Sequence, residues 1–123
     1  MLFYARELLA LCLGRRAMAR VAGASMAPTL ADGAVIAIRP AVGELPAPGQ
    51  VVVVTDPRDG SRLVKRCSSA ATATFAVMSD NPDGATDSRT FGSLSRSELV
   101  GLAVWSWTLR GGFRDLRGGS RCR

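Results

Sequence analysis

The segment 51–67 constrains the fold of this chain more than any other part of it. Residues 51–55 (VVVVT) are β-branched and apolar on both faces, a pattern that predicts a buried strand. Residues 56–60 (DPRDG) are turn formers, and residues 62–67 (RLVKRC) predict the strand that returns from the turn. A buried hairpin of this kind indicates a core built mainly from β-strands.

The rest of the chain fits a mainly β fold with one short N-terminal helix. Short apolar or alternating runs bounded by turn formers predict extended segments or strands at 19–23, 34–38, 74–78 and 99–109. Residues 79–92 (SDNPDGATDSRTFG) predict a long polar loop. Residues 3–13 predict a short amphipathic helix that docks on the domain or lies on a membrane surface.

A length of 123 residues indicates a single domain. We divide the chain into a helix and lead-in (1–20), a β domain (21–109) and a flexible basic tail (110–123). The glycines of the tail and its lack of periodicity predict no packed structure. The formal charge of +6 owes much to this tail, and no RNA-binding, zinc-finger or helix-turn-helix pattern accompanies it. We therefore expect a solvated tail and no nucleic-acid partner.

Cysteine and histidine usage excludes several classes of site. The chain has no histidine, and its three cysteines are far apart, at Cys12, Cys67 and Cys122. They form neither a disulfide framework nor a metal-binding pair, so we expect a cytoplasmic protein without a metal or other cofactor. The apolar part of residues 3–13 is too short to cross a bilayer, so at most peripheral membrane contact is expected.

Proton chemistry in this chain has few candidates, because Lys65 is the only lysine among sixteen basic residues. Without histidine, a Ser-His-Asp triad and a Cys-His pair are excluded, and a Ser-Lys dyad remains. Strand alternation places Lys65 on one face with Leu63 and Cys67, an apolar surrounding that favours the neutral amine. A lysine base needs its pKa lowered by roughly 2 to 3 units from about 10.4. Codon bias towards arginine is the simpler explanation of the lone lysine.

Three ordered motifs resemble those of the signal peptidase I family of Ser-Lys proteases. Residues 23–30 (GASMAPTL) resemble its nucleophile box, G-x-S-M-x-P-T-L, and residues 62–66 (RLVKR) resemble its lysine box. Residues 79–92 resemble its third box, G-D-N followed by D-S-R-x-F-G. The resemblance implies the coiled β-sheet half-barrel of signal peptidases and LexA. It is closest to the nickel-type superoxide dismutase maturation proteases, which implies that the chain removes an N-terminal extension from such a precursor protein.

The same resemblance implies a role for each matching residue. Ser25 would be the nucleophile and Lys65 the general base, and the backbone N–H of Ser25 would help to form an oxyanion hole. Some members add a hydroxyl at the position held here by Gly23. Met26 and Pro28 would shape the substrate groove. The residues implied to support the site belong to the third box: Asp80, Asn81, Asp87, Ser88 and Arg89, with Asp87 and Arg89 paired beside the lysine.

Two positions depart from the family pattern. Ser79 replaces the first glycine of G-D-N. Ala85 stands where many members have a serine that bonds the lysine amine, which leaves the usual partner of Lys65 missing. Thr86, one residue later, is a candidate substitute.

Other functions remain open beside a soluble endopeptidase that trims one precursor. One is a membrane-associated signal peptidase that cleaves exported preproteins. A self-cleaving repressor of the related Ser-Lys class is less favoured, because only 24 residues precede Ser25 and the nearest of them lie too close to reach back. From a different class, the chain is an inactive binding module with a basic tail. Salt-dependent binding to nucleic acid would favour that function.

Overall fold

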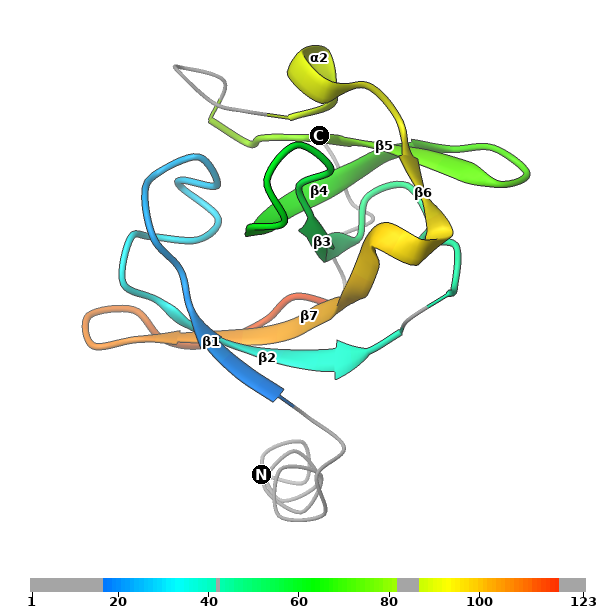
Figure 1. Ribbon diagram of the computed structural model, residues 1–123. Helices are drawn as coiled ribbons and strands as arrows, with labels where there is room; N and C mark the ends of the chain where they lie inside the picture. Colours follow the sequence, from blue (N-terminus) through cyan, green and yellow to red (C-terminus); the bar gives the residue numbers. More distant parts are fainter. Residues whose placement is uncertain (1–16, 42, 82–86, 118–123) are drawn as a thin grey trace.

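An eight-stranded antiparallel sheet forms the body of the molecule (Figure 1). The computed structural model describes residues 17–41, 43–81 and 87–117. The elements in chain order are β1 (Ala17–Arg20), β2 (Val35–Pro40), β3 (Val51–Thr55), β4 (Arg62–Ala70), β5 (Thr74–Met78), α2 (Ser88–Phe91), β6 (Leu94–Ser95), a 3₁₀ turn (Arg96–Glu98), β7 (Leu99–Thr108) and β8 (Gly112–Asp115). The helix predicted over residues 3–13 lies outside the described residues.

The strand order is β1-β2-β7-β3-β4-β5-β6, with β8 added to β7. The first half of β7 pairs with β2 on one side and with β3 on the other, and its second half pairs with β8 instead of β3. A Cβ atom at Gly101 would lie 2.5 Å from the carbonyl oxygen of Arg39, so glycine at this position allows β2 and β7 to pack closely. The long strand β7 therefore joins the two halves of the sheet.

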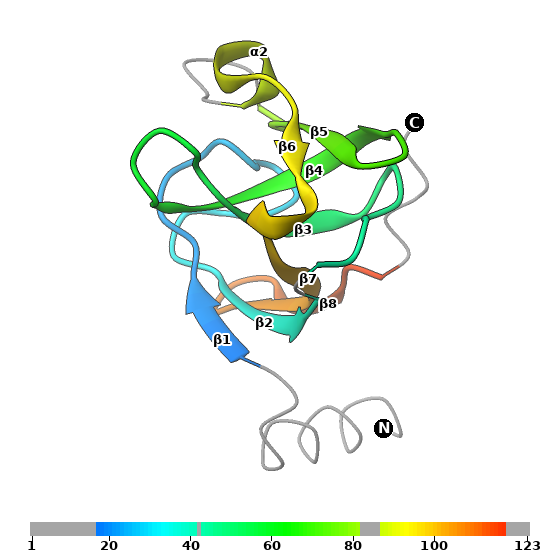
Figure 2. The ribbon, with the colours of Figure 1, turned by 45° about the vertical axis from the view of Figure 1, so that its right-hand side comes forward.

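The sheet is coiled into the expected half-barrel. Register shifts occur in the β2–β7, β3–β7 and β4–β5 pairs, and irregularities of this kind bend and twist a sheet. In Figures 1 and 2, β2 and β7 lie at the bottom of the view and β4 and β5 at the top, with β3 between them. The predicted mainly β architecture is confirmed.

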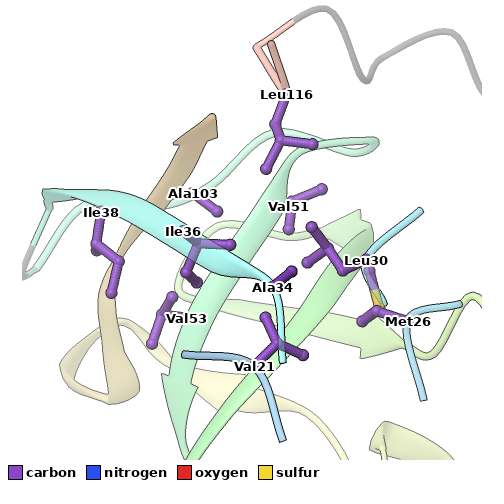
Figure 3. Packing of buried hydrophobic residues seen from close by; sticks show 10 residues of the cluster. All are labelled: Val21, Met26, Leu30, Ala34, Ile36, Ile38, Val51, Val53, Ala103 and Leu116. Carbon is purple, nitrogen blue, oxygen red and sulfur yellow. The ribbon is translucent and has the colours of Figure 1, made fainter. Parts of the chain in front are cut away.

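The two faces of β3 support two separate hydrophobic clusters. Val51 and Val53 pack in one cluster with residues of β2 and of the segment between β1 and β2, as Figure 3 shows. Val52 and Val54 pack in the other, with residues of β4, β5 and β7. All four valines are buried, which confirms the strand predicted from their sequence. Burial of a valine side chain stabilises a fold by about 1.5 to 3 kcal/mol, so this strand is a major source of stability.

Two expectations about the later part of the chain are wrong. A short helix, α2, interrupts the loop predicted over residues 79–92, and Asp87 caps it by accepting a hydrogen bond from the N–H of Arg89. Residues 112–116 of the predicted flexible tail are packed, because β8 pairs with β7 and Leu116 is buried in the core. Gly111 lies in the turn of the β7–β8 hairpin, and Phe113 lies against Trp105 with ring centroids 4.5 Å apart. Residues 118–123 lie outside the described part.

No helix in the described part of the chain has the length and apolar character that crossing a membrane requires.

Candidate active site

Ser25 lies in a tight turn between β1 and β2. The side chain of Asp32 accepts a hydrogen bond from the N–H of Gly23 at 2.8 Å, and the N–H of Leu30 donates to the carbonyl oxygen of Met26 at 2.8 Å. Gly23 has a φ of 88°, a left-handed conformation that strains most other residues. A hydroxyl-bearing residue is therefore disfavoured at position 23, and the turn presents a glycine two residues before the serine.

The two residues implied to shape a groove have different surroundings. Met26 is fully buried in the core cluster shown in Figure 3. It therefore attaches the serine turn to the core, and it has no exposed surface with which to shape a groove. Pro28 is exposed. Together with residues of the β7–β8 hairpin it lines a pocket of about 340 Å³, where a guanidinium N–H of Arg114 donates to the carbonyl oxygen of Thr29 at 2.9 Å.

Lys65 is buried on β4, where only 3% of its surface is exposed. It lies opposite Val52 in the β3–β4 register and is followed on the same face by the buried thiol of Cys67, as the alternation predicts. Its Nζ lies 3.1 Å from Ser25 Oγ and 2.9 Å from Ser79 Oγ. Burial lowers the pKa of Lys65, against a smaller opposing effect of the Asp87 charge. A serine hydroxyl and a desolvated amine thus lie within the distance that proton transfer requires.

Asn81 joins the third box to the serine turn. Its backbone N–H donates to the carbonyl oxygen of Ser25 at 2.8 Å. Its side-chain amide donates to the carbonyl oxygen of Ala24 at 3.1 Å. Two consecutive carbonyl groups at the nucleophile are therefore held by one residue, which fixes the position of the turn relative to β5.

Asp80 makes a second link between the same segments, on the opposite face of β4 from Lys65. Its carboxylate accepts two hydrogen bonds from the guanidinium of Arg66, at 2.9 and 2.8 Å, and one from the hydroxyl of Thr29 at 2.6 Å. Arg66 also donates to the carbonyl oxygen of Gly49 at 2.8 Å. Burial by itself would raise the pKa of Asp80, but the hydrogen bonds from Arg66 and Thr29 outweigh it and lower the pKa.

Asp87 holds the segment around Ser79 in place. Its carboxylate is fully buried and accepts hydrogen bonds from the N–H of Ser79 at 3.0 Å and from the Arg89 side chain at 2.9 and 3.1 Å. Burial would raise its pKa, yet these hydrogen bonds hold the pKa at about 2. Ser88 accepts a hydrogen bond from the N–H of Val77 at 2.8 Å, which attaches α2 to β5. Asp87 and Arg89 are paired and Asp87 acts electrostatically on Lys65, in the arrangement that the resemblance implies.

The model of the Peptidase S24-like family matches residues 5–104, which is more than half of the chain. The chain belongs to the Peptidase S24-like family. No curated protein matches the sequence. Membership indicates a function of the serine peptidase type, and the half-barrel is the fold expected of such a peptidase.

Three residues of this peptidase domain contribute to the site although the sequence did not single them out as site residues. Ser79 contacts the lysine amine, Asp32 holds the N–H of Gly23, and Arg66 pairs with Asp80. Ser79 was visible in the sequence only as a departure from the family pattern. Ala85 and Thr86, the positions considered for a lysine partner, lie outside the described residues.

One edge of β4 beside Lys65 is unpaired with any strand among the described residues. Residues 62–66 pair with β3 on one side, whereas pairing with β5 begins only at Arg66. Within the described residues, the other edge of residues 62–65 therefore has no strand partner. Backbone groups at such an edge bind an extended peptide as an added strand. In the same described ranges, no three His, Cys, Asp or Glu side chains are arranged to hold a metal ion.

Proposed function

We propose that this protein is a serine endopeptidase with a Ser25–Lys65 dyad. The observation that carries the proposal is the 3.1 Å separation between Ser25 Oγ and the amine of a lysine that is almost completely shielded from water. A lysine in that position serves as a base because its burial favours the neutral amine.

The dyad supports a two-step reaction. In the first step, neutral Lys65 takes the proton of Ser25 while Oγ forms a bond to the carbonyl carbon of the scissile peptide. The resulting ammonium then protonates the leaving amine as the C–N bond breaks, which leaves an ester on Ser25. Water hydrolyses this ester in the second step, with Lys65 again accepting a proton. The backbone N–H of Ser25 is the proposed donor to the oxyanion.

The substrate we propose is a precursor protein with an N-terminal extension, and specifically a nickel-type superoxide dismutase precursor. The open edge of β4 beside Lys65 supports an extended peptide as the bound form. The choice of precursor rests on the resemblance of the three motifs to the maturation proteases, and the family match supports only the peptidase class.

Co-expression with the precursor tests the proposal, with intact mass as the measurement. We expect the wild-type chain to shorten the precursor, and Ser25→Ala and Lys65→Arg to leave it intact while circular dichroism shows that both variants are folded. Arg39→Lys, an exchange at a partly exposed position of β2, is the matched control and keeps full activity. Full activity in Lys65→Arg would overturn the dyad, because arginine does not supply a neutral base near pH 7.

The same mass measurements distinguish the proposed function from self-cleavage and from signal peptidase activity. A wild-type chain that shortens itself and spares the precursor would indicate self-cleavage. Cleavage of an exported preprotein by a protein that stays with membranes after a high-salt wash would indicate a signal peptidase.

A further inference from the structure

We propose that Ser79 is the positioning residue of the lysine base. Its hydroxyl accepts a hydrogen bond from one N–H of Lys65 and thereby turns the lone pair of the amine towards Ser25. This inference rests on the proposed Ser-Lys function and deepens it. It assigns a role to a residue that stands where the signal peptidase pattern has glycine.

The contact between Ser79 and Lys65 is short and shielded from water. Nζ lies 2.9 Å from Ser79 Oγ, and both residues are buried. A buried hydrogen bond between groups that water does not reach has a well-defined geometry, because no solvent molecule competes for either partner. The Ser79 contact is also shorter than the 3.1 Å contact with Ser25 Oγ.

The chemistry of a neutral amine explains why a second hydroxyl matters. Such an amine has two N–H donors and a single lone pair, and only the lone pair can accept the serine proton. Rotation about the Cε–Nζ bond moves the lone pair away from Ser25 unless another contact stops it. Among the described residues, both hydrogen bonds of Lys65 Nζ go to hydroxyl groups, on Ser25 and Ser79. Donation to Ser79 therefore fixes the rotation and leaves the lone pair for Ser25.

Ser79 is held firmly enough to act in this way. Its backbone N–H donates to the buried carboxylate of Asp87 at 3.0 Å, and Asp87 is fixed in turn by Arg89. On its other side in the chain, Asp80 is paired with Arg66. The backbone is therefore held both at Ser79, by Asp87, and at the next residue, by Arg66. The position of the Ser79 hydroxyl does not depend on its contact with the lysine.

Kinetics of a single-residue series test the positioning role, with the full-length chain and the cleavable precursor. We expect Ser79→Ala to lower kcat by about 10- to 100-fold with KM changed less than about 2-fold, because the base is misoriented while the peptide still binds. Ser79→Thr restores the hydroxyl and recovers most of kcat. Ser93→Ala, at an exposed serine of the same region, is the matched control and keeps wild-type kinetics. Unchanged kcat in Ser79→Ala, or equally low kcat in Ser79→Thr, would overturn the proposal.

A second measurement needs no substrate, because the chain contains a single lysine. Selective labelling with ¹³C-lysine gives one Cε signal, whose titration follows the protonation of Lys65. The Ser79 hydroxyl stabilises the ammonium by accepting a hydrogen bond from it, so Ser79→Ala moves the titration midpoint to lower pH and Ser93→Ala does not. An unmoved midpoint would rule out the contact. A moved midpoint in a protein that cleaves no precursor would retain the contact and reject the proposed function.

Discussion

The side chains of Lys65 and Arg66 are neighbours on β4, but they have opposite surroundings. Lys65 is buried on a face of β4 that it shares with Leu63 and Cys67, and this burial disfavours its charged form. Arg66 faces the other side, where a carboxylate and a carbonyl oxygen satisfy its guanidinium. Strand alternation separates the two environments over one residue. One strand thus carries both the proposed base and an arginine that links Asp80 to the carbonyl oxygen of Gly49.

Lys65→Met should have the largest effect and should separate activity from stability. We expect cleavage to fall by about 10² to 10⁴-fold, the usual contribution of a general base. The free energy of unfolding at neutral pH should rise, because the buried amine is replaced by an apolar side chain of similar length. Urea titration and cleavage assays on the same samples measure both quantities.

The pH dependence of that gain follows from the pKa of Lys65. Its folded-state pKa lies below the ordinary value of 10.5, so the unfolded chain binds this proton more tightly than the folded chain. Wild-type stability therefore increases as the pH rises towards 10.5, and the advantage of Lys65→Met should shrink over that interval. A variant less stable than wild type at every pH would show that burial does not disfavour the charge of Lys65.

On the Arg66 side, Asp80→Asn should destabilise the fold by about 2 to 4 kcal/mol, because it removes the carboxylate charge that pairs with a largely buried guanidinium. The hydrogen bond that the Thr29 hydroxyl of the serine turn donates to residue 80 weakens in the same variant. Urea unfolding measures the loss. The double variant Arg66→Met, Asp80→Leu should recover much of it, and a loss below about 0.5 kcal/mol in the single variant would place this pair among ordinary surface pairs.

Asp87→Asn should cost about 2 kcal/mol at pH 7, the value that corresponds to a carboxyl pKa near 2 instead of 3.8. A depressed carboxyl pKa contributes stability that is fully present above 3.8 and is lost as the pH falls through about 2. The wild-type and variant unfolding curves should therefore converge near pH 2. Convergence of the two curves already at pH 5 would contradict a carboxyl pKa of about 2 for Asp87.

Glu44→Ala should have the smallest effect. Glu44 and Arg39 are 3.5 Å apart and their side chains are 55% and 38% exposed, so their attraction is weakened by solvent. We expect a loss below about 0.5 kcal/mol in urea unfolding. The contrast with Asp80→Asn would measure what burial adds to an ion pair in the same sheet, and similar losses in both would remove the distinction.

The sequence predicts best those features that depend on neighbouring residues. The bounds of β3 and β5 agree with the prediction, since turn formers flank β3 on both sides and follow β5. The face of Lys65 follows from alternation alone. The half-barrel and the proposed Ser25–Lys65 dyad both follow from the resemblance over three separated motifs.

The features that sequence reasoning missed depend on contacts between distant segments. The four residues of β8 form a strand because β7 is there to pair with them, whereas the local sequence, rich in glycine, predicts flexibility. The helix α2 has only four residues, and its capping residue Asp87 lies among other polar residues. The contact of Ser79 with Lys65 depends on where β5 ends relative to β4, and no local pattern specifies that position.

The burial of Leu116 bears on where the domain ends. The family match stops at residue 104, inside β7, whereas the packed unit continues through β8 to Leu116. A shortened protein that ended at the family boundary would cut the central strand and remove a side chain from the core. It would also remove Arg114, which bonds the carbonyl oxygen of Thr29 in the serine turn. Fusion partners and affinity tags on the C-terminal side should therefore be joined beyond residue 117.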